Sequence, residues 1–193
     1  MSQKLIIGIT GTLGAGKGTI VDYLKQKYIF NHFSASEFIT EEIIIRDLPI
    51  NRDTMREVGN DLREKNSPSY VAEELYKRAL NVKGDAILES LRTLGEINAL
   101  KQKGNFYLFA VNANQKIRYA RILLRKSQKD NVSYDKFIEN EMQESQSDEP
   151  HKQNLPKCIQ QADYIFENNN SFEELYKQID QVMEKIKNDD NNL

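Results

Sequence analysis

The chain has 193 residues, of which 39% are hydrophobic, a composition that excludes wholesale disorder and suits one domain with its own core. Its 27 basic and 29 acidic side chains give a net charge of −2 at pH 7, which disfavours a general binder of nucleic acid or anionic membranes. No apolar run is long enough to cross a membrane, and the single cysteine, Cys158, excludes an internal disulfide and a cysteine-built metal site. Residues 1–5 lack the cleavage site of a signal peptide, so we expect one cytoplasmic domain over residues 1–193.

Short apolar runs alternate with helical patterns along the chain. We expect strands at 4–10, 32–35, 85–90, 105–113 and 163–168. We expect helices at 17–27, 36–47, 53–65, 69–81, 94–102, 115–126, 133–145, 155–162 and 171–187. This alternation predicts an α/β fold with a parallel sheet covered on both faces. In such folds ligands bind at the carboxyl ends of the strands, so the residues just after each strand are the candidate functional residues.

A glycine-rich segment follows the first expected strand and opens the first expected helix. Its glycines allow backbone N–H groups to turn inward around phosphate oxygens, and the helix N-terminus adds positive potential. Lys17 is expected to reach the β- and γ-phosphates of a nucleotide, and Thr19 another phosphate oxygen. A turn that binds no ligand is the alternative. The predicted nucleotide-binding residues of this segment are Gly11, Thr12, Leu13, Gly14, Ala15, Gly16, Lys17, Gly18 and Thr19.

Gly18 stands where P-loop proteins usually carry the serine or threonine that binds magnesium. The string GxxGxGKGT resembles the phosphate loop of adenylate kinase and other nucleoside monophosphate kinases, in which the same glycine follows the lysine. This resemblance implies the P-loop fold, with three layers, a parallel five-stranded sheet of order 2-3-1-4-5 and a short helical lid. It also implies activity with ATP and Mg²⁺. The first strand and the phosphate loop also resemble, more distantly, those of dephospho-coenzyme A kinase.

The segment after the second expected strand bears on the phosphoryl acceptor. Residues 34–40 resemble the acceptor-binding segment of adenylate kinase, with Glu37 in place of an aspartate and Thr40 in place of an arginine that grips the acceptor phosphate. From this resemblance we expect Ser34 and Glu37 to bind the acceptor, within a helical insert at about 36–81. No aspartate stands here to deprotonate a hydroxyl, which favours a phosphate acceptor because a phosphate oxygen needs no base.

Arginines in the next expected helix supply positive charge for such an acceptor. Arg56, Asn60 and Arg63 recur at i, i+4 and i+7, so they share one helical face. Together with Arg46 and Arg52 they are expected to line a pocket for the acceptor phosphate. A solvated helix face is the alternative interpretation.

The third expected strand ends at Glu89 and is followed by Arg92. This segment resembles the part of nucleoside monophosphate kinases in which an aspartate orients magnesium-bound water and an arginine binds the acceptor phosphate. The resemblance gives the metal role, through water, to Glu89 and the acceptor role to Arg92. A glutamate–arginine salt bridge at the strand end is the alternative.

An arginine-rich helix follows the fourth expected strand. Arg118, Arg121 and Arg125 share one of its faces, and three neighbouring cations predict a polyphosphate anion. Arg121 and Arg125 match the spacing at the start of the lid in adenylate kinases. This resemblance implies that Arg121 packs on the adenine of ATP and that Arg125 contacts its phosphates. For Arg118 a place on the helix surface is the alternative.

The expected lid spans about 126–150, with Lys126, Lys129 and Asp130 as candidate residues. Lids of this kind exclude water from the phosphates. After the last strand, Asn168 is expected to contact the adenine of ATP, although an asparagine-rich turn explains this loop equally well.

The combined prediction is an enzyme that transfers a phosphoryl group from ATP to a nucleoside or deoxynucleoside monophosphate. Lys17, Arg92, Arg125 and Glu89 are its predicted catalytic residues, and small-molecule nucleotides are its only predicted partners, without nucleic acid or membrane. Two alternatives stay open. One is phosphorylation of a hydroxyl, as in dephospho-coenzyme A kinase, with Glu37 as the base. The other is an ATP-binding switch module without catalytic activity.

Overall fold

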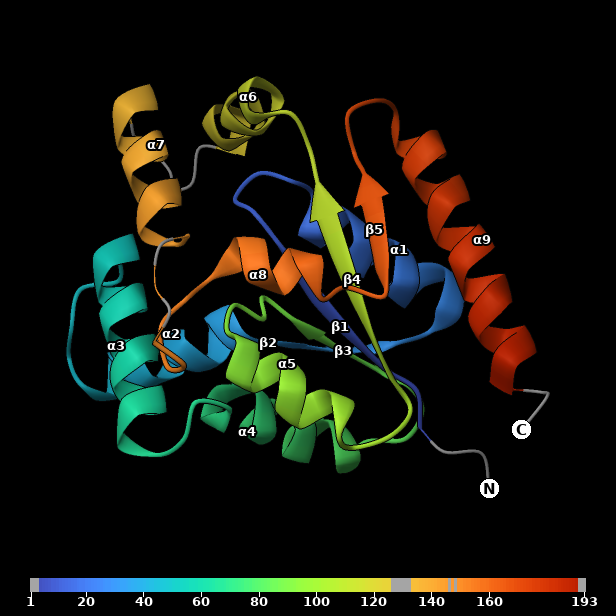
Figure 1. Ribbon diagram of the computed structural model, residues 1–193, viewed down its shortest axis with the longest axis horizontal. Coiled ribbons are helices and arrows are strands. Elements are labelled where there is room, and N and C mark those ends of the chain that lie inside the picture. Colours follow the sequence, from blue (N-terminus) through green and yellow to red (C-terminus); the bar gives the residue numbers. More distant parts are fainter. Residues whose placement is uncertain (1–3, 126–132, 146, 148, 191–193) are drawn as a thin grey trace.

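The computed structural model describes residues 4–125, 133–145, 147 and 149–190. These residues form three layers with a parallel five-stranded sheet in the middle, as Figure 1 shows. The strands are β1 (Ile6–Gly11), β2 (Asn31–Ser34), β3 (Ala86–Glu89), β4 (Phe106–Asn112) and β5 (Tyr164–Glu167). Their order is β2-β3-β1-β4-β5, so the predicted fold class and strand order are confirmed.

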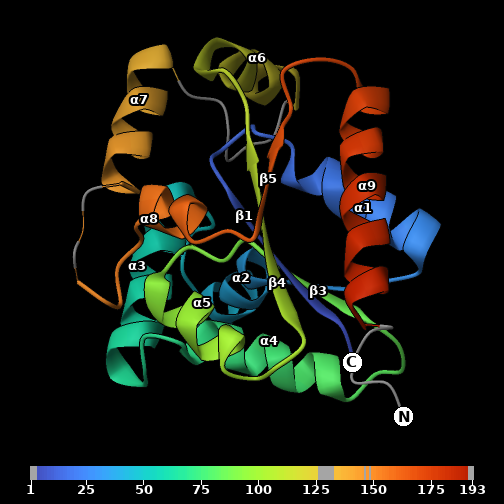
Figure 2. The ribbon, with the colours of Figure 1, turned by 45° about the vertical axis from the view of Figure 1, so that its right-hand side comes forward.

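The helices of the described residues lie close to their predicted ranges. They are α1 (Lys17–Tyr28), α2 (Ala35–Ile45), α3 (Arg52–Lys65), α4 (Tyr70–Leu80), α5 (Leu94–Lys101), α6 (Gln115–Arg125), α7 (Tyr134–Gln143), α8 (Leu155–Gln160) and α9 (Phe172–Asp190). Helices α1 and α9 lie side by side on one face of the sheet, and α2, α4, α5 and α8 cover the other (Figures 1 and 2). None of these helices is long and apolar enough to cross a membrane.

Strand β1 contributes to a hydrophobic core on each side of the sheet. Ile7 and Ile9 pack toward α1 and α9, whereas Ile6 packs toward α2, α4 and α5. Successive side chains of a strand point to opposite faces, so a central strand covered on both faces is apolar at nearly every position. The exception in β1 is Thr10, whose buried hydroxyl donates to the carbonyl oxygen of Leu91. This packing holds β1 in the middle of the sheet and fixes where its carboxyl end, and the loop that follows, lie.

A third, smaller core joins α6 and α7 above the loop that follows β1. Leu13 of that loop packs with Ile122 and Phe137, which are both fully buried. Arg118 is buried at 7% exposure and forms an ion pair with Glu141 of α7. Arg118 therefore does not lie on the helix surface. Instead it fixes α7 over the loop.

Candidate functional site

The predicted phosphate loop, residues 11–19, connects the carboxyl end of β1 to the first turn of α1. Two of its glycines have left-handed backbone conformations, with φ of 77° at Gly14 and 109° at Gly16. A Cβ atom at Gly14 would lie 2.5 Å from the carbonyl oxygen of Arg118, and one at Gly16 would collide with the amide of Asn168. No described side chain caps the N-terminus of α1, so its first N–H groups remain available to an anion.

Lys17 is held by the loop that it follows. Its Nζ donates hydrogen bonds to the carbonyl oxygens of Gly11 at 2.8 Å and Thr12 at 3.1 Å. Burial and the nearby charge of Arg92 lower the pKa of Lys17 to about 8. A phosphate beside this ammonium group would favour its charged form, so the binding of an anion here is electrostatically favourable.

Glu89 ends β3 and faces the same space. Its Oε1 accepts a hydrogen bond from Ser90 Oγ at 3.0 Å, and its Oε2 lies 3.5 Å from His32 Nε2. Burial alone would raise the pKa of Glu89, but His32, Ser90 and the charge of Lys17 hold it at about 2. Glu89 is therefore ionised across the physiological range. It is suited to orient metal-bound water and poorly suited to accept a proton.

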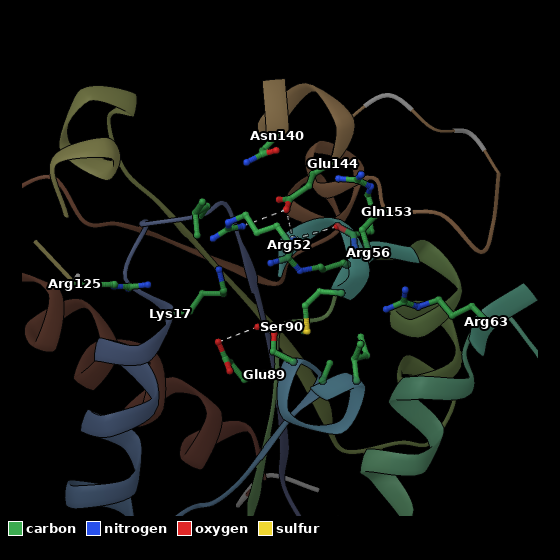
Figure 3. Close-up of a pocket in the computed structure, with 16 residues that line it drawn as sticks. Lys17, Arg52, Arg56, Arg63, Glu89, Ser90, Arg125, Asn140, Glu144 and Gln153 are labelled. Carbon is green, nitrogen blue, oxygen red and sulfur yellow. Dashed lines mark hydrogen bonds and ion pairs between the residues drawn. The ribbon is translucent and has the colours of Figure 1, made fainter. Parts of the chain in front are cut away.

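A cavity of about 270 Å³ has Lys17 in its lining. Figure 3 shows the residues that surround it. The walls of the cavity come from the phosphate loop, the ends of α1 and α6, the helices α2, α3 and α7, and the segments that follow β3 and precede α8. The charged residues that line it are Lys17, Arg52, Arg56, Arg63, Glu89, Arg92, Arg125 and Glu144. The uncharged lining residues are Leu13, Ala35, Ser36, Ile39, Met55, Ser90, Asn140 and Gln153.

The cavity brings together residues that sequence reasoning had placed on three different segments. Lys17, Glu89, Arg92 and Arg125 all line it, which is the set predicted to act on the transferring phosphoryl group. They come from α1, β3 and its exit, and the end of α6. Parallel strands place these exits at one edge of the sheet, which explains why they meet.

Two predicted acceptor-binding residues lie elsewhere in the described structure. Ser34 is buried, and its Oγ caps α2 by accepting a hydrogen bond from the backbone N–H of Glu37 at 3.4 Å. Glu37 itself is exposed on the first turn of α2, outside the cavity lining. Arg46, which was also considered for the acceptor pocket, instead pairs with Asp61 at 2.6 Å.

Arg63 lines the cavity but is neutralised within the protein. It pairs with Glu96, and both side chains are fully buried, with an Arg63 Nε to Glu96 Oε1 distance of 2.8 Å. The second oxygen of Glu96 accepts hydrogen bonds from the backbone N–H groups of Arg92 at 2.9 Å and Thr93 at 3.1 Å. The pair therefore fixes the backbone of Arg92 at the edge of the cavity.

Residues from the end of α7 onward contact the acceptor arginines, and the sequence analysis did not identify them. Arg92 Nη1 lies 2.8 Å from Glu144 Oε1 and 3.1 Å from Gln153 Oε1. Arg56 donates to Gln143 Oε1 at 2.6 Å and pairs with Asp53 at 2.7 Å. No local motif marks these partners, because they are far from Arg92 in the sequence.

On the donor side, Asn168 connects the phosphate loop to Arg121. Its Nδ2 donates to the carbonyl oxygen of Ala15 at 2.8 Å, and its Oδ1 accepts from Arg121 Nη2 at 3.4 Å. The side chain of Asn168 is thus bonded to protein groups and holds the loop. Arg121 Nη1 is buried and has no hydrogen-bond partner among the described residues, and burial and the charge of Arg125 lower the pKa of Arg121. Both features fit an anionic ligand at this position.

These donors fit the phosphates of ATP. Lys17, at the uncapped N-terminus of α1, and Arg125 line one cavity, and Arg121 is joined to the phosphate loop through Asn168. The described residues hold no cluster of three or more histidine, cysteine or acidic side chains, so Mg²⁺ would rely on phosphate oxygens, water and Glu89. The candidate lid residues Lys126, Lys129 and Asp130 lie outside the described residues.

Comparisons with known proteins agree with this fold. A family model described as an AAA domain matches residues 10–137. UPF0200 protein MJ1399 from Methanocaldococcus jannaschii is 27% identical over 187 residues, which cover 95% of this chain and 91% of the relative. A shikimate kinase structure from Bacteroides thetaiotaomicron has a TM-score of 0.60 at 14% identity, covering 93% of this chain and 98% of that one. A gluconokinase structure from Sinorhizobium meliloti has a TM-score of 0.60 at 8% identity, covering 97% and 95%. The chain thus has a P-loop kinase-like fold, which does not single out adenylate kinases.

Proposed function

Because the chain belongs to this family of AAA domains and has a P-loop kinase-like fold, we propose that it transfers the γ-phosphoryl group of ATP to a nucleoside or deoxynucleoside monophosphate. The observation that carries the proposal is that Lys17 and the arginines Arg52, Arg56 and Arg92 line the same cavity. A donor phosphate on the loop and an acceptor phosphate on these arginines would lie within the same cavity.

The charge of the cavity supports a phosphate acceptor. Among the described residues, six cationic side chains and two carboxylates line it. Guanidinium groups pair with phosphate oxygens through two parallel hydrogen bonds, which favours arginine wherever phosphate is recognised. Arg92 and Arg52 face Glu144, and a phosphate can take the place of that carboxylate on these arginines, whereas a neutral acceptor cannot.

The carboxylates of the site argue against a hydroxyl acceptor. A hydroxyl needs a base that takes its proton during transfer, whereas a phosphate oxygen is already anionic. Glu37 is exposed and outside the cavity lining, and the pKa of Glu89 is about 2. Glu144 is paired with Arg92. None of these three carboxylates is a suitable base in the described structure.

In the proposed reaction an oxygen of the acceptor phosphate attacks the γ-phosphorus while the bond to the β–γ bridging oxygen breaks. Lys17 and the loop N–H groups hold the donor phosphates, and Arg92 and Arg125 stabilise the charge on the transferring group. Glu89 would hold the metal ion through water. Mg²⁺, when bound, supplies neutralisation of the phosphate oxygens.

The test is release of ADP across a panel of ribo- and deoxynucleoside monophosphates, with dephospho-coenzyme A included. We expect at least one monophosphate to stimulate ADP release and to be converted to the diphosphate. Phosphorylation of dephospho-coenzyme A in preference to every monophosphate would overturn the proposal. Tight ATP binding without acceptor-dependent ADP release would support the switch module instead.

A further inference from the structure

Glu144 lies on the acceptor side of the cavity, among the arginines (Figure 3). Resting on the function proposed above, we propose that Glu144 is an internal substitute for the acceptor phosphate. It occupies Arg92 and Arg52 in the empty site and must leave when a phosphate-bearing acceptor binds. An acceptor anion would therefore have to bind Arg92 and Arg52 strongly enough to displace the Glu144 carboxylate.

The contacts of Glu144 are those expected of a bound anion. Its Oε1 lies 2.8 Å from Arg92 Nη1 and 3.9 Å from Arg52 Nη1, so one oxygen faces both guanidinium groups. The side chain is 12% exposed, which reduces solvent screening of these charges. The charge of Glu144 also reaches Lys17, where it favours the protonated amine. Glu144 therefore acts electrostatically on both the acceptor arginines and the donor loop.

The backbone around Glu144 is fixed, so the carboxylate is presented from a rigid position. Its N–H donates to Asn140 at the end of α7, and its carbonyl oxygen accepts from the N–H of Leu155 at 3.1 Å. The helix itself is anchored by the ion pair of Glu141 with Arg118 and by the buried ring of Phe137. Exchange of the carboxylate for a ligand thus needs rotation of one side chain and no movement of α7.

A second observation indicates that a ligand belongs at this place. Asn140 lies one turn before Glu144, lines the same cavity and is 4% exposed. Its Oδ1 has no hydrogen-bond partner in the part of the chain that the structure describes. A buried amide oxygen without a partner costs free energy, and a donor group of a bound acceptor would satisfy it. Asn140 and Gln153 thus add polar groups to the cavity that Glu144 lines.

The consequence for specificity follows from effective concentration. A tethered carboxylate competes with free ligands as though it were present at a concentration of the order of millimolar or higher. A free carboxylate that binds the arginines equally well must exceed this concentration to displace it. A phosphate dianion carries about twice the charge and three acceptor oxygens, so it displaces Glu144 at a lower concentration. The acceptor class is therefore phosphomonoesters, rather than acids anchored by a carboxylate alone.

The experiment compares Glu144→Gln with wild type in equilibrium binding, using protein saturated with ADP and Mg²⁺ so that the phosphate loop is filled. Inorganic phosphate and acetate are the two probes, titrated at constant ionic strength. Glutamine retains a hydrogen-bond acceptor for Arg92 but loses the charge. Glu139→Gln is the matched control, because Glu139 is on α7, is exposed and pairs with Lys136.

We expect Glu144→Gln to tighten the binding of both probes by a similar factor of about ten, which corresponds to about 1.4 kcal/mol. Both affinities should change by the same factor because Glu144 competes equally with either probe for the arginines. Glu139→Gln should leave both affinities unchanged. Equal affinities in Glu144→Gln and wild type, or weaker binding in Glu144→Gln, would overturn the inference. Because no turnover is measured, failure of this test is distinct from failure to find a phosphorylated product.

Discussion

Replacement of Arg63 by methionine tests whether its main role is structural. Methionine replaces the aliphatic part of the arginine side chain but lacks the charge that faces Glu96. Both side chains are fully buried, and removal of one partner of such a pair typically costs about 3–5 kcal/mol. Glu96 keeps its hydrogen bonds from the N–H groups of Arg92 and Thr93, so we expect the lower end, about 3 kcal/mol. At this chain length that loss lowers Tm by about 6–12 °C.

Urea unfolding followed by circular dichroism measures the loss. Arg78→Met is the control, because Arg78 pairs with Glu41 on the surface, where an ion pair contributes at most about 1 kcal/mol. The double variant Arg63→Met/Glu96→Gln should be more stable than Arg63→Met, since it no longer buries a lone charge. A loss below about 1 kcal/mol in Arg63→Met, together with a large rise in the acceptor KM, would refute the structural role and make Arg63 an acceptor ligand.

The remaining predictions concern the donor side. Lys17→Ala should abolish phosphoryl transfer and leave the far-ultraviolet circular dichroism unchanged, and near-normal turnover would remove the phosphate-loop assignment. ATP affinity should fall as the pH rises through about 8, because Lys17 loses its proton above its pKa of about 8. An affinity that stays flat across this range would contradict that role. Asn168→Ala should raise the KM for ATP about tenfold by freeing the carbonyl of Ala15, with the acceptor KM as the internal control. An unchanged KM for ATP would show that the loop needs no such support.

Much of the fold could be predicted because its signals are local. The apolar run of β1, followed by glycines and Lys17, marks a buried strand, a phosphate loop and a helix within about fifteen residues. Alternation of strands and helices then implies a parallel sheet, and its strand exits bring Glu89 and Arg92 to the loop. These parts depend on periodicity and on the general geometry of α/β sheets.

The acceptor side could be predicted less well, because its contacts are long-range. Glu144 reaches Arg92 from a segment about fifty residues later, and no spacing rule connects the two. Ser34 was assigned to the acceptor by resemblance, yet a serine three residues before a glutamate is also a helix-capping signal, and the structure uses it as one. The contact between His32 and Glu89 could not be predicted either, because it depends on the register between β2 and β3.

Identification of the new phosphorus bond tests the central claim most directly. Phosphorus-31 NMR of the products formed from ATP and the most active acceptor distinguishes a phosphoanhydride from a phosphomonoester. Our account predicts a coupled pair of signals from a nucleoside diphosphate derived from the acceptor, formed in step with ADP. A new uncoupled phosphomonoester signal, which arises from transfer to a hydroxyl, would contradict it.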